Sequence, residues 1–456
     1  MLNKRSLTSV AVAVAFLVSL IGPAPESWAQ RSGLSLIRDA EIEHTIRVFV
    51  TPAFVAAGLE PSSIKIYLVN DPAINAFVAA GQNIFINTGL IIRTENPGQL
   101  IGVVAHETGH IAGGHLARGE EAMRTAFYES ILSMVLGAAA MVAGGGGAGQ
   151  AIMAGGQQVA QRSFLQFSRT QEAQADNAGV NFLTRSGQSA RGLLEFLQIL
   201  EGQEALTSNR QDPYVLTHPL SRERVAALRL EVEKSPFYNK PWPPEYVEMH
   251  KRIRAKLIGF MEPLGQVLRQ YPETDQSRPA RYARAIAYYR VPEFDKAISE
   301  LDSLLKERPD DPYFLELKGQ ILLENGHVAE SVPVYEAAVK NDPDEPLIRY
   351  ALGQAQLSTE QPELTKTAIA NLEQAVREDP DNPGAWYQLS VGYGRENNLG
   401  MAHLASAERA MLVGRPLDAK QQAERALTRL ARGSPAALRA EDIVSIAGTR
   451  IKDERR

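Results

Sequence analysis

The sequence contains an HExxH motif, His106-Glu107-Thr108-Gly109-His110. Because residues four apart on an α-helix lie on the same face, the two imidazoles of this motif can reach one zinc ion. Glu107 then lies beside the ion, where its carboxylate can accept a proton from a bound water. Asn96 and Pro97 are typical of a helix cap and a first helical position, and they predict a helix from there to about Leu116.

A zinc site that keeps one position open for water needs a third protein ligand. The best candidate is Glu172, in the sequence Glu172-Ala173-Gln174-Ala175-Asp176. Residues 169–182 have helical spacing, so Glu172 and Asp176 share a face. Asp176 can then hydrogen-bond a ligand histidine or handle a proton near the scissile amide. The residues alone leave open the alternative of a solvated acidic face on a surface helix.

Composition excludes several other kinds of site. None of the 456 residues is cysteine, which excludes disulfides, iron–sulfur clusters, cysteine-ligated zinc and thiol nucleophiles. Any metal must therefore be held by histidine and carboxylate side chains. Lys and Arg number 48 against 53 Asp and Glu, for a net charge of −5, so we expect no nucleic acid partner. The length predicts more than one domain.

The N-terminal segment is typical of a secretory signal peptide. Lys4 and Arg5 precede an uncharged apolar run that ends near Ile21, and Ser27-Trp28-Ala29 supplies small residues at the two key positions of a cleavage site. We therefore expect a signal peptide at residues 1–29 and a mature protein that works outside the cytoplasm. An uncleaved membrane anchor is the alternative reading of the same residues.

The C-terminal part of the sequence is repetitive. Pro309-Asp310-Asp311-Pro312 recurs as Pro343-Asp344-Glu345-Pro346 and as Pro380-Asp381-Asn382-Pro383, at offsets of 34 and 37 residues. A period near 34 with a helical pattern predicts tetratricopeptide repeats, which stack into an all-α solenoid. Such solenoids present a concave groove that commonly holds peptides or partner proteins.

Between the signal peptide and the repeats, strand-like stretches at residues 64–69 and 83–87 mix with helical patterns. This mixture predicts an α+β domain. The sequence thus divides into a signal peptide at 1–29, an α+β metallopeptidase domain at 30–255 and a tetratricopeptide repeat domain at 256–456.

The motifs in combination resemble the zincin-type (gluzincin) metallopeptidases of the HtpX and Ste-type group, above all the periplasmic members that carry a C-terminal repeat array. The resemblance covers nearly the whole mature chain. Besides HExxH and the glutamate helix, the shared features are Asn75-Ala76-Phe77, Gly81, Thr88-Gly89-Leu90, His115-Leu116-Ala117-Arg118, Thr217-His218-Pro219-Leu220 and Arg224.

The resemblance implies roles for individual residues. It implies that one Zn²⁺ per chain is held by His106, His110 and Glu172, with Glu107 as the catalytic base and Asp176 as a proton donor. The zinc would lower the pKa of its water and polarise the substrate carbonyl.

Four further expectations concern the surroundings of the zinc. His218 reads as a surface histidine from the sequence alone, but the resemblance implies a regulatory fourth ligand that takes the water position. Arg224 is a candidate for stabilising charge in the transition state, and His115 is expected to be structural. The strand at residues 83–87 is expected to be the sheet edge on which an extended substrate pairs.

The resemblance also implies a function. It indicates a periplasmic zinc-dependent endopeptidase with a chaperone-like role, which degrades misassembled outer-membrane proteins and assists their assembly. The repeat groove would dock outer-membrane proteins or their assembly machinery. The alternative is a latched or inactive metallopeptidase that acts mainly as a binding or scaffold protein through its repeats.

Residues 130–161 contain no charged residue and eight glycines. The glycine run at 144–147 argues against one stable helix, because each interior glycine costs about 1 kcal/mol relative to alanine. We expect a flap or helical hairpin near the active-site mouth that makes peripheral contact with a membrane or an apolar client. A re-entrant membrane hairpin and a glycine-rich loop are the alternatives.

Overall fold

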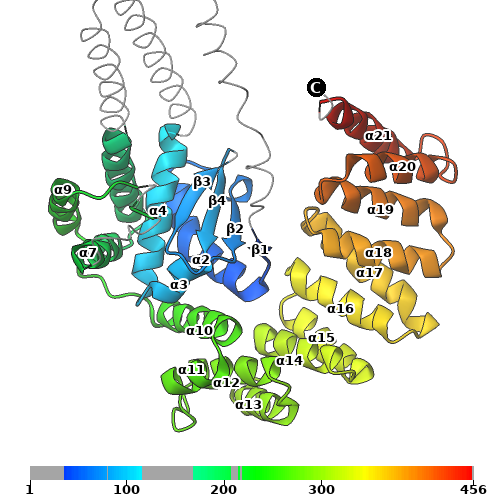
Figure 1. Ribbon diagram of the computed structural model, residues 1–456, viewed down its shortest axis with the longest axis horizontal. Helices are drawn as coiled ribbons and strands as arrows, with labels where there is room; N and C mark the ends of the chain where they lie inside the picture. The colour runs from blue at the N-terminus through cyan, green and yellow to red at the C-terminus, as the bar shows by residue number, and fades with distance from the viewer. Residues whose placement is uncertain (1–34, 80, 116–167, 207–213, 216–217, 454–456) are drawn as a thin grey trace, which may run out of the picture.

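The computed structural model describes residues 35–79, 81–115, 168–206, 214–215 and 218–453 (Figure 1). The expectations for the signal peptide at 1–29 and for the uncharged segment at 130–161 lie outside these residues. In the described part of the chain, a small mixed sheet with its helices is followed by a long array of paired helices (Figure 1). The predicted architecture, an α+β part followed by a helical repeat array, is confirmed.

The sheet of the N-terminal part has four strands in the order β1-β2-β4-β3. Strands β2 and β4 pair in parallel, while β1 on β2 and β3 on β4 are antiparallel. Their bounds are β1 Leu36–Ile37, β2 Lys65–Val69, β3 Ala76–Ala79 and β4 Asn83–Asn87. The expectation that residues 83–87 form the open edge is wrong, because β4 is hydrogen-bonded on both sides. The edge strands of this sheet are β1 and β3.

One face of this sheet packs on helices α2 and α4, and the buried residues of these elements form the main hydrophobic core. Inward-facing Ile66, Leu68, Ile84 and Ile86 alternate with outward-facing neighbours, as a half-buried sheet requires. The helices of this part are α2 Ala40–Ala56, η2 Pro61–Ser63, α3 Thr88–Arg93, α4 Pro97–Gly113, residues 168–185, α7 Arg191–Leu206 and α9 Arg222–Lys234.

Helix α4, which carries the HExxH motif, starts as predicted. The Asn96 side chain accepts a hydrogen bond from the backbone N–H of Gln99, and the Gln99 side chain accepts one from the N–H of Glu95. The helix ends at Gly113, three residues before the predicted end, because Gly114 adopts a left-handed conformation with φ 62° that stops it. The motif therefore occupies the last full turns of a well-capped helix.

The repeats form a curved array of helices from α10 to α21 (Figure 1). Proline stands in the first turn of α14, α16 and α18, where its missing N–H costs nothing, and Asp311, Glu345 and Asn382 cap the three helices. The helices are α10 Pro244–Met261, α11 Leu264–Gln270, α12 Arg278–Arg290, α13 Phe294–Glu307, α14 Pro312–Glu324, α15 Val328–Asn341, α16 Pro346–Ser358, α17 Pro362–Glu378, α18 Pro383–Arg395, α19 Leu399–Leu412, α20 Pro416–Leu427 and α21 Pro435–Asp453.

The two parts are joined by helix α10, which packs on α2 and α3 on one side and on α12 on the other. The predicted domain boundary after residue 255 falls inside this helix. Buried charges link the parts here: Arg252 lies 2.7 Å from Glu41 of α2 and 2.6 Å from Asp311 at the start of α14. Lys256 lies 2.8 Å from Asp39, and Tyr282 donates a 2.8 Å hydrogen bond to Glu41.

Replacing Glu41 with alanine is expected to lower the free energy of unfolding by about 3 kcal/mol, because Arg252 and Lys256 would remain as buried cations without their shared partner. Urea unfolding followed by circular dichroism measures this change. Glu43→Ala is the control, since Glu43 pairs with the more exposed Arg38 and its loss should cost about 0.5 kcal/mol. Equal effects of the two changes would contradict a structural role for the buried network.

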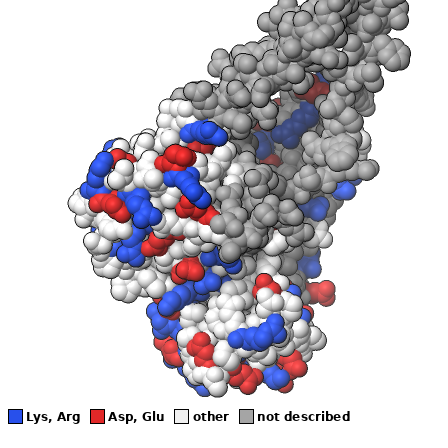
Figure 2. All heavy atoms as spheres, turned by 60° about the vertical axis from the view of Figure 1, so that its left-hand side comes forward, with Lys and Arg blue, Asp and Glu red and all other residues white. Residues whose placement is uncertain are grey.

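The array also touches the sheet a second time, farther along. The loop before α18 forms ion pairs with the N-terminal part, between Asp379 and Arg38 at 2.9 Å and between Asp381 and Lys65. Figure 2 shows Lys and Arg interspersed with Asp and Glu over the described part of one face of the molecule. Among the helices that the structure describes, none has both the length and the apolar character needed to cross a membrane.

Candidate metal centre

The centre forms where helix α4 crosses the helix at residues 168–185. Small residues allow the close approach: a Cβ atom on Gly109 would lie 2.6 Å from the carbonyl oxygen of Ala175, and one on Gly179 would lie 3.2 Å from the backbone of Ala105. A larger side chain at Gly109 would therefore push the two helices apart. This crossing brings the HExxH motif against Glu172, although sixty-two residues separate Glu172 from His110 in the sequence.

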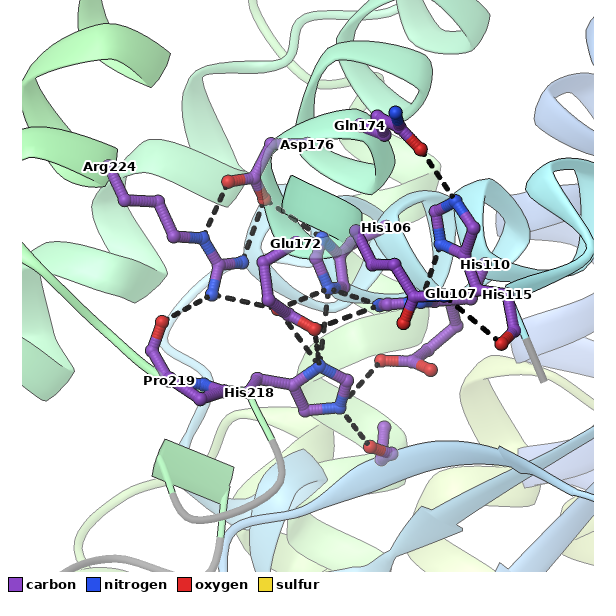
Figure 3. Close-up of polar contacts among 12 residues, drawn as sticks. His106, Glu107, His110, His115, Glu172, Gln174, Asp176, His218, Pro219 and Arg224 are labelled. Atoms are coloured by element: carbon purple, nitrogen blue, oxygen red, sulfur yellow. Dashed lines mark hydrogen bonds and ion pairs between the residues drawn. The ribbon is translucent and has the colours of Figure 1, made fainter. Parts of the chain in front are cut away.

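Four side chains converge on one point in the described part of the chain: His106, His110, Glu172 and His218 (Figure 3). Nε2 of His106 lies 3.1 Å from Nε2 of His110 and 3.4 Å from Nδ1 of His218. The Glu172 carboxylate lies 3.4 Å from Nε2 of His110 and 3.2 Å from Nδ1 of His218. Three of the four are predicted ligands, and the fourth is the predicted regulatory histidine.

These separations fit a tetrahedral zinc site. Ligand atoms about 2.05 Å from an ion lie about 3.3 Å from one another when they are arranged as a tetrahedron. The observed separations of 3.1 to 3.4 Å match that edge length. Nitrogen and carboxylate oxygen donors are also the set that zinc accepts in catalytic sites. The residues present therefore fit the metal that the motif implies.

The hydrogen bonds behind the three histidines determine which ring nitrogen faces the centre. Nδ1 of His106 donates a 2.8 Å hydrogen bond to the Asp176 carboxylate, so Nε2 is the nitrogen that would face a metal. Nε2 of His218 lies 3.2 Å from the carbonyl oxygen of Ala76, which leaves its Nδ1 as the acceptor. Nδ1 of His110 lies 3.0 Å from Nδ1 of His115, so its other nitrogen, Nε2, faces the centre.

The surrounding charges shift the pKa values of the site. Burial acts to lower the pKa of His106, but hydrogen bonds to Asp176 and Glu172 outweigh it and raise that pKa to about 10. Burial dominates for His110 and lowers its pKa. Burial alone would raise the pKa of Asp176, yet hydrogen bonds from Arg224 and His106 bring it down to about 2. A metal at this point must therefore displace a tightly held proton from His106.

Arg224 closes the site from the side opposite His110 (Figure 3). Its guanidinium donates hydrogen bonds of 2.6 and 2.9 Å to the two oxygens of Asp176 and lies 2.8 Å from Glu172. These two carboxylates outweigh the effect of burial and raise the pKa of Arg224. Because its charge is already committed to Asp176 and Glu172, the geometry favours a positioning role over the expected contact with the transition state.

Glu107 differs from every other carboxylate of the site. Its side chain is 1% exposed, and neither oxygen has a hydrogen-bond partner among the described residues. Nε2 of His218 lies 3.4 Å from Oε1, beyond a well-formed hydrogen bond. Both oxygens of Glu107 are therefore available to a ligand bound between this side chain and the four donors.

Two contacts of the site carry no signal in the sequence. The ring of Tyr214 stacks on His218 with centroids 4.6 Å apart and planes 28° apart, and the backbone N–H of His218 bonds to the Tyr214 carbonyl at 2.7 Å. The second contact is that of His218 with the carbonyl oxygen of Ala76. A backbone atom is common to all residues, so no sequence motif can indicate this contact. His115, expected to be structural, contacts His110 and donates a hydrogen bond from Nε2 to the side-chain oxygen of Gln174 at 3.2 Å.

Comparisons with known proteins agree with the motif and the repeats. Residues 25–232 match the model of Peptidase family M48, and residues 282–346 and 316–366 match the tetratricopeptide repeat model. The beta-barrel assembly-enhancing protease of Yersinia pestis is 27% identical over 84% of this chain and 79% of its own length. The protein of that name in Escherichia coli strain K12 is 27% identical over 76% of this chain and 71% of its own.

Two further similarities cover less of the chain. Metalloprotease LoiP of Escherichia coli strain K12 is 30% identical over 37% of this chain and 62% of its own length. The crystal structure of MamA has a TM-score of 0.29 at 19% identity, with 38% of this chain and 96% of MamA covered. The predicted resemblance to a metallopeptidase with a repeat array is confirmed by the two family matches.

Proposed function

Because the chain is a metallopeptidase that carries a family M48 domain and tetratricopeptide repeats, we propose that it is a periplasmic zinc-dependent endopeptidase that degrades misassembled outer-membrane proteins and assists their assembly. The client class is supported by two relatives named beta-barrel assembly-enhancing proteases. The observation that carries the peptidase activity is the convergence of His106, His110 and Glu172 beside the unbonded carboxylate of Glu107.

Each residue of the centre has a task in peptide hydrolysis. When bound, zinc supplies Lewis acidity, which polarises the peptide carbonyl and lowers the pKa of a water toward neutrality. Glu107 takes the proton of the attacking water and returns it to the leaving amine. Asp176 fixes the tautomer and ring orientation of His106, and its low pKa favours this task over proton donation.

The substrate is proposed to pair with edge strand β3 rather than with β4. In an antiparallel ladder, hydrogen-bonded and non-hydrogen-bonded residue pairs alternate. The bond from the Asn87 N–H to the Asn75 carbonyl sets this alternation, so Ala76 and Val78 direct their N–H and C=O groups away from β4. The carbonyl of Ala76 reaches the metal centre through His218. An extended peptide added at this edge would pass the centre directly.

His218 supports a latch on the same site. Its Nδ1 lies among the donor atoms, where it takes a ligand position, and its Nε2 contacts the Ala76 carbonyl. The same side chain therefore also blocks a backbone group with which a substrate strand would pair. This arrangement also supports the second candidate function, a latched metallopeptidase that acts mainly as a binding protein. Cleavage of an unfolded protein by the native chain would support the endopeptidase function over this second function.

Replacing His218 with alanine is expected to raise the rate of cleavage about tenfold, as for a latch that leaves about a tenth of the molecules competent. The measurement uses the purified, zinc-loaded protein and an unfolded outer-membrane β-barrel protein, with product bands followed by gel and mass spectrometry. His327→Ala is the control, because His327 is a surface histidine that pairs with Glu330.

Unchanged or slower cleavage by the His218 variant would contradict the latch. If neither the native chain nor the variant cut the unfolded protein, the endopeptidase proposal itself would be wrong.

The repeats are proposed to dock outer-membrane proteins or their assembly machinery. Between the last repeats lies a cavity of about 480 Å³, which has the size of a binding site for a short peptide segment. Its lining combines apolar side chains with charges of both signs, in Pro380, Asp381, Trp386, Glu408, Met411, Leu412, Arg439, Ile443, Ile446 and Arg450. We further propose periplasmic localisation after removal of residues 1–29, and peripheral membrane contact through residues 130–161.

A further inference from the structure

Three aromatic rings form a row across the sheet on the face opposite the core. Tyr67 of β2, Phe85 of β4 and Phe77 of β3 are directly paired in the strand register. The ring centroids are 5.1 Å apart in both pairs, and the ring planes are inclined by only 19° and 8°. All three side chains are half-buried, and none belongs to the hydrophobic core between the sheet and its helices.

This row ends at the open edge of the sheet. Phe77 belongs to β3, which pairs only with β4 among the described strands. Its neighbours Ala76 and Val78 direct their backbone groups outward, and the carbonyl of Ala76 lies at the metal centre. A strand added to β3 would lie about 4.8 Å away, which is close to the ring spacing inside the row. A side chain opposite Phe77 would therefore continue the stack.

We propose that Phe77 determines specificity by selecting extended substrates that present an aromatic side chain opposite its ring. This inference rests on the proposed function, because it requires a substrate strand on β3. Cross-strand aromatic pairs are favourable, and the row behind Phe77 holds its ring in the stacking orientation. The occupant is thus a segment with alternating aromatic residues. Strands of outer-membrane β-barrels alternate apolar and polar residues, and aromatic residues form girdles near their ends.

The test measures binding separately from cleavage. The zinc-loaded full chain with Glu107→Gln and His218→Ala cannot take a proton from water and leaves the Ala76 carbonyl accessible. Two fluorescein-labelled peptides are titrated by fluorescence anisotropy, one with Tyr at every second position and one with Ser in place of each Tyr. A shift of the bound peptide by one residue turns the side chains of one face to the other face. The Tyr peptide therefore has a register that places a Tyr ring opposite Phe77.

We expect the Tyr peptide to bind about threefold to tenfold more tightly than the Ser peptide. Adding Phe77→Ala should remove this preference, and Phe77→Tyr should restore it. Phe77→Leu keeps an apolar side chain but removes the ring, so it should also remove the preference. It serves as the second variant if the alanine variant folds poorly. Leu230→Ala, which removes an exposed apolar side chain from α9, is the control.

Equal affinity for the two peptides, or a preference that survives both Phe77→Ala and Phe77→Leu, would overturn the inference and leave the peptidase proposal intact. No affinity for either peptide, together with no cleavage of unfolded protein by the native chain, would overturn the proposed function and this inference with it. Loss of the preference in the Phe77→Tyr variant as well would also count against stacking.

Discussion

Replacing Glu107 with glutamine is expected to abolish peptide-bond cleavage while the metal stays bound. Glutamine has the shape of glutamate but cannot take a proton from water, and a general base contributes about 10²- to 10⁴-fold to the rate. Glu107 is not one of the converging donors, so metal affinity should change little. The loss is measured as the initial rate on an unfolded outer-membrane protein, with metal content determined by elemental analysis on the same sample.

Glu231→Gln is a matched control for that change. Glu231 is a solvent-exposed glutamate of α9, and its carboxylate pairs with Lys234. It should cleave at the native rate. Full proteolysis by the Glu107 variant would show that another group accepts the proton, and loss of its zinc would show that the side chain contributes to metal binding.

Replacing Glu172 with alanine is expected to remove the metal itself. Both proteins are prepared in the His218→Ala background, because His218 could otherwise take the place of the lost ligand. The protein that keeps Glu172 should hold about one zinc per chain, and the Glu172 variant should hold close to none after dialysis, because two imidazoles alone do not complete a catalytic zinc site. The remaining Asp176 cannot substitute, since its oxygens are committed to His106 and Arg224. Elemental analysis of both proteins after identical purification measures the stoichiometry.

Glu231→Ala controls for the loss of a carboxylate on the surface and should retain its zinc. A full complement of zinc in the Glu172 variant would contradict the proposed ligand set. Absence of zinc from the native protein, even after reconstitution, would favour the alternative in which the chain acts as a binding protein through its repeats.

The sequence predicted the parts of the centre that depend on helical spacing. His106 and His110 lie one turn apart, and the Asn96 cap fixes where their helix begins, so local rules suffice for these residues. Glu172 could be proposed because Asp176 follows it at helical spacing. What local rules could not supply was the crossing of the two helices, which depends on the close approach of Gly109 to Ala175.

The open edge of the sheet was predicted wrongly for a physical reason. The strand at 83–87 has a clear apolar alternation, while the flanking strand at 76–79 is short and begins with a small residue. The edge was therefore assigned to the segment with the stronger strand pattern. Which strand lies at an edge depends on pairing between segments, and strand patterns do not encode it. For the same reason the sequence did not place His218 at Ala76, 142 residues earlier.

The double contact of His218 has a consequence for which proteins can be cut. In the proposed latch, the imidazole acts as a competitive inhibitor tethered to its own target, and tethering gives such a group an effective concentration in the millimolar range. A short flexible loop, which offers a single N–H to the Ala76 carbonyl, competes poorly with it. A long unpaired strand offers several hydrogen bonds at once and prevails. The enzyme would then spare folded barrels and attack chains whose strands have not yet found partners.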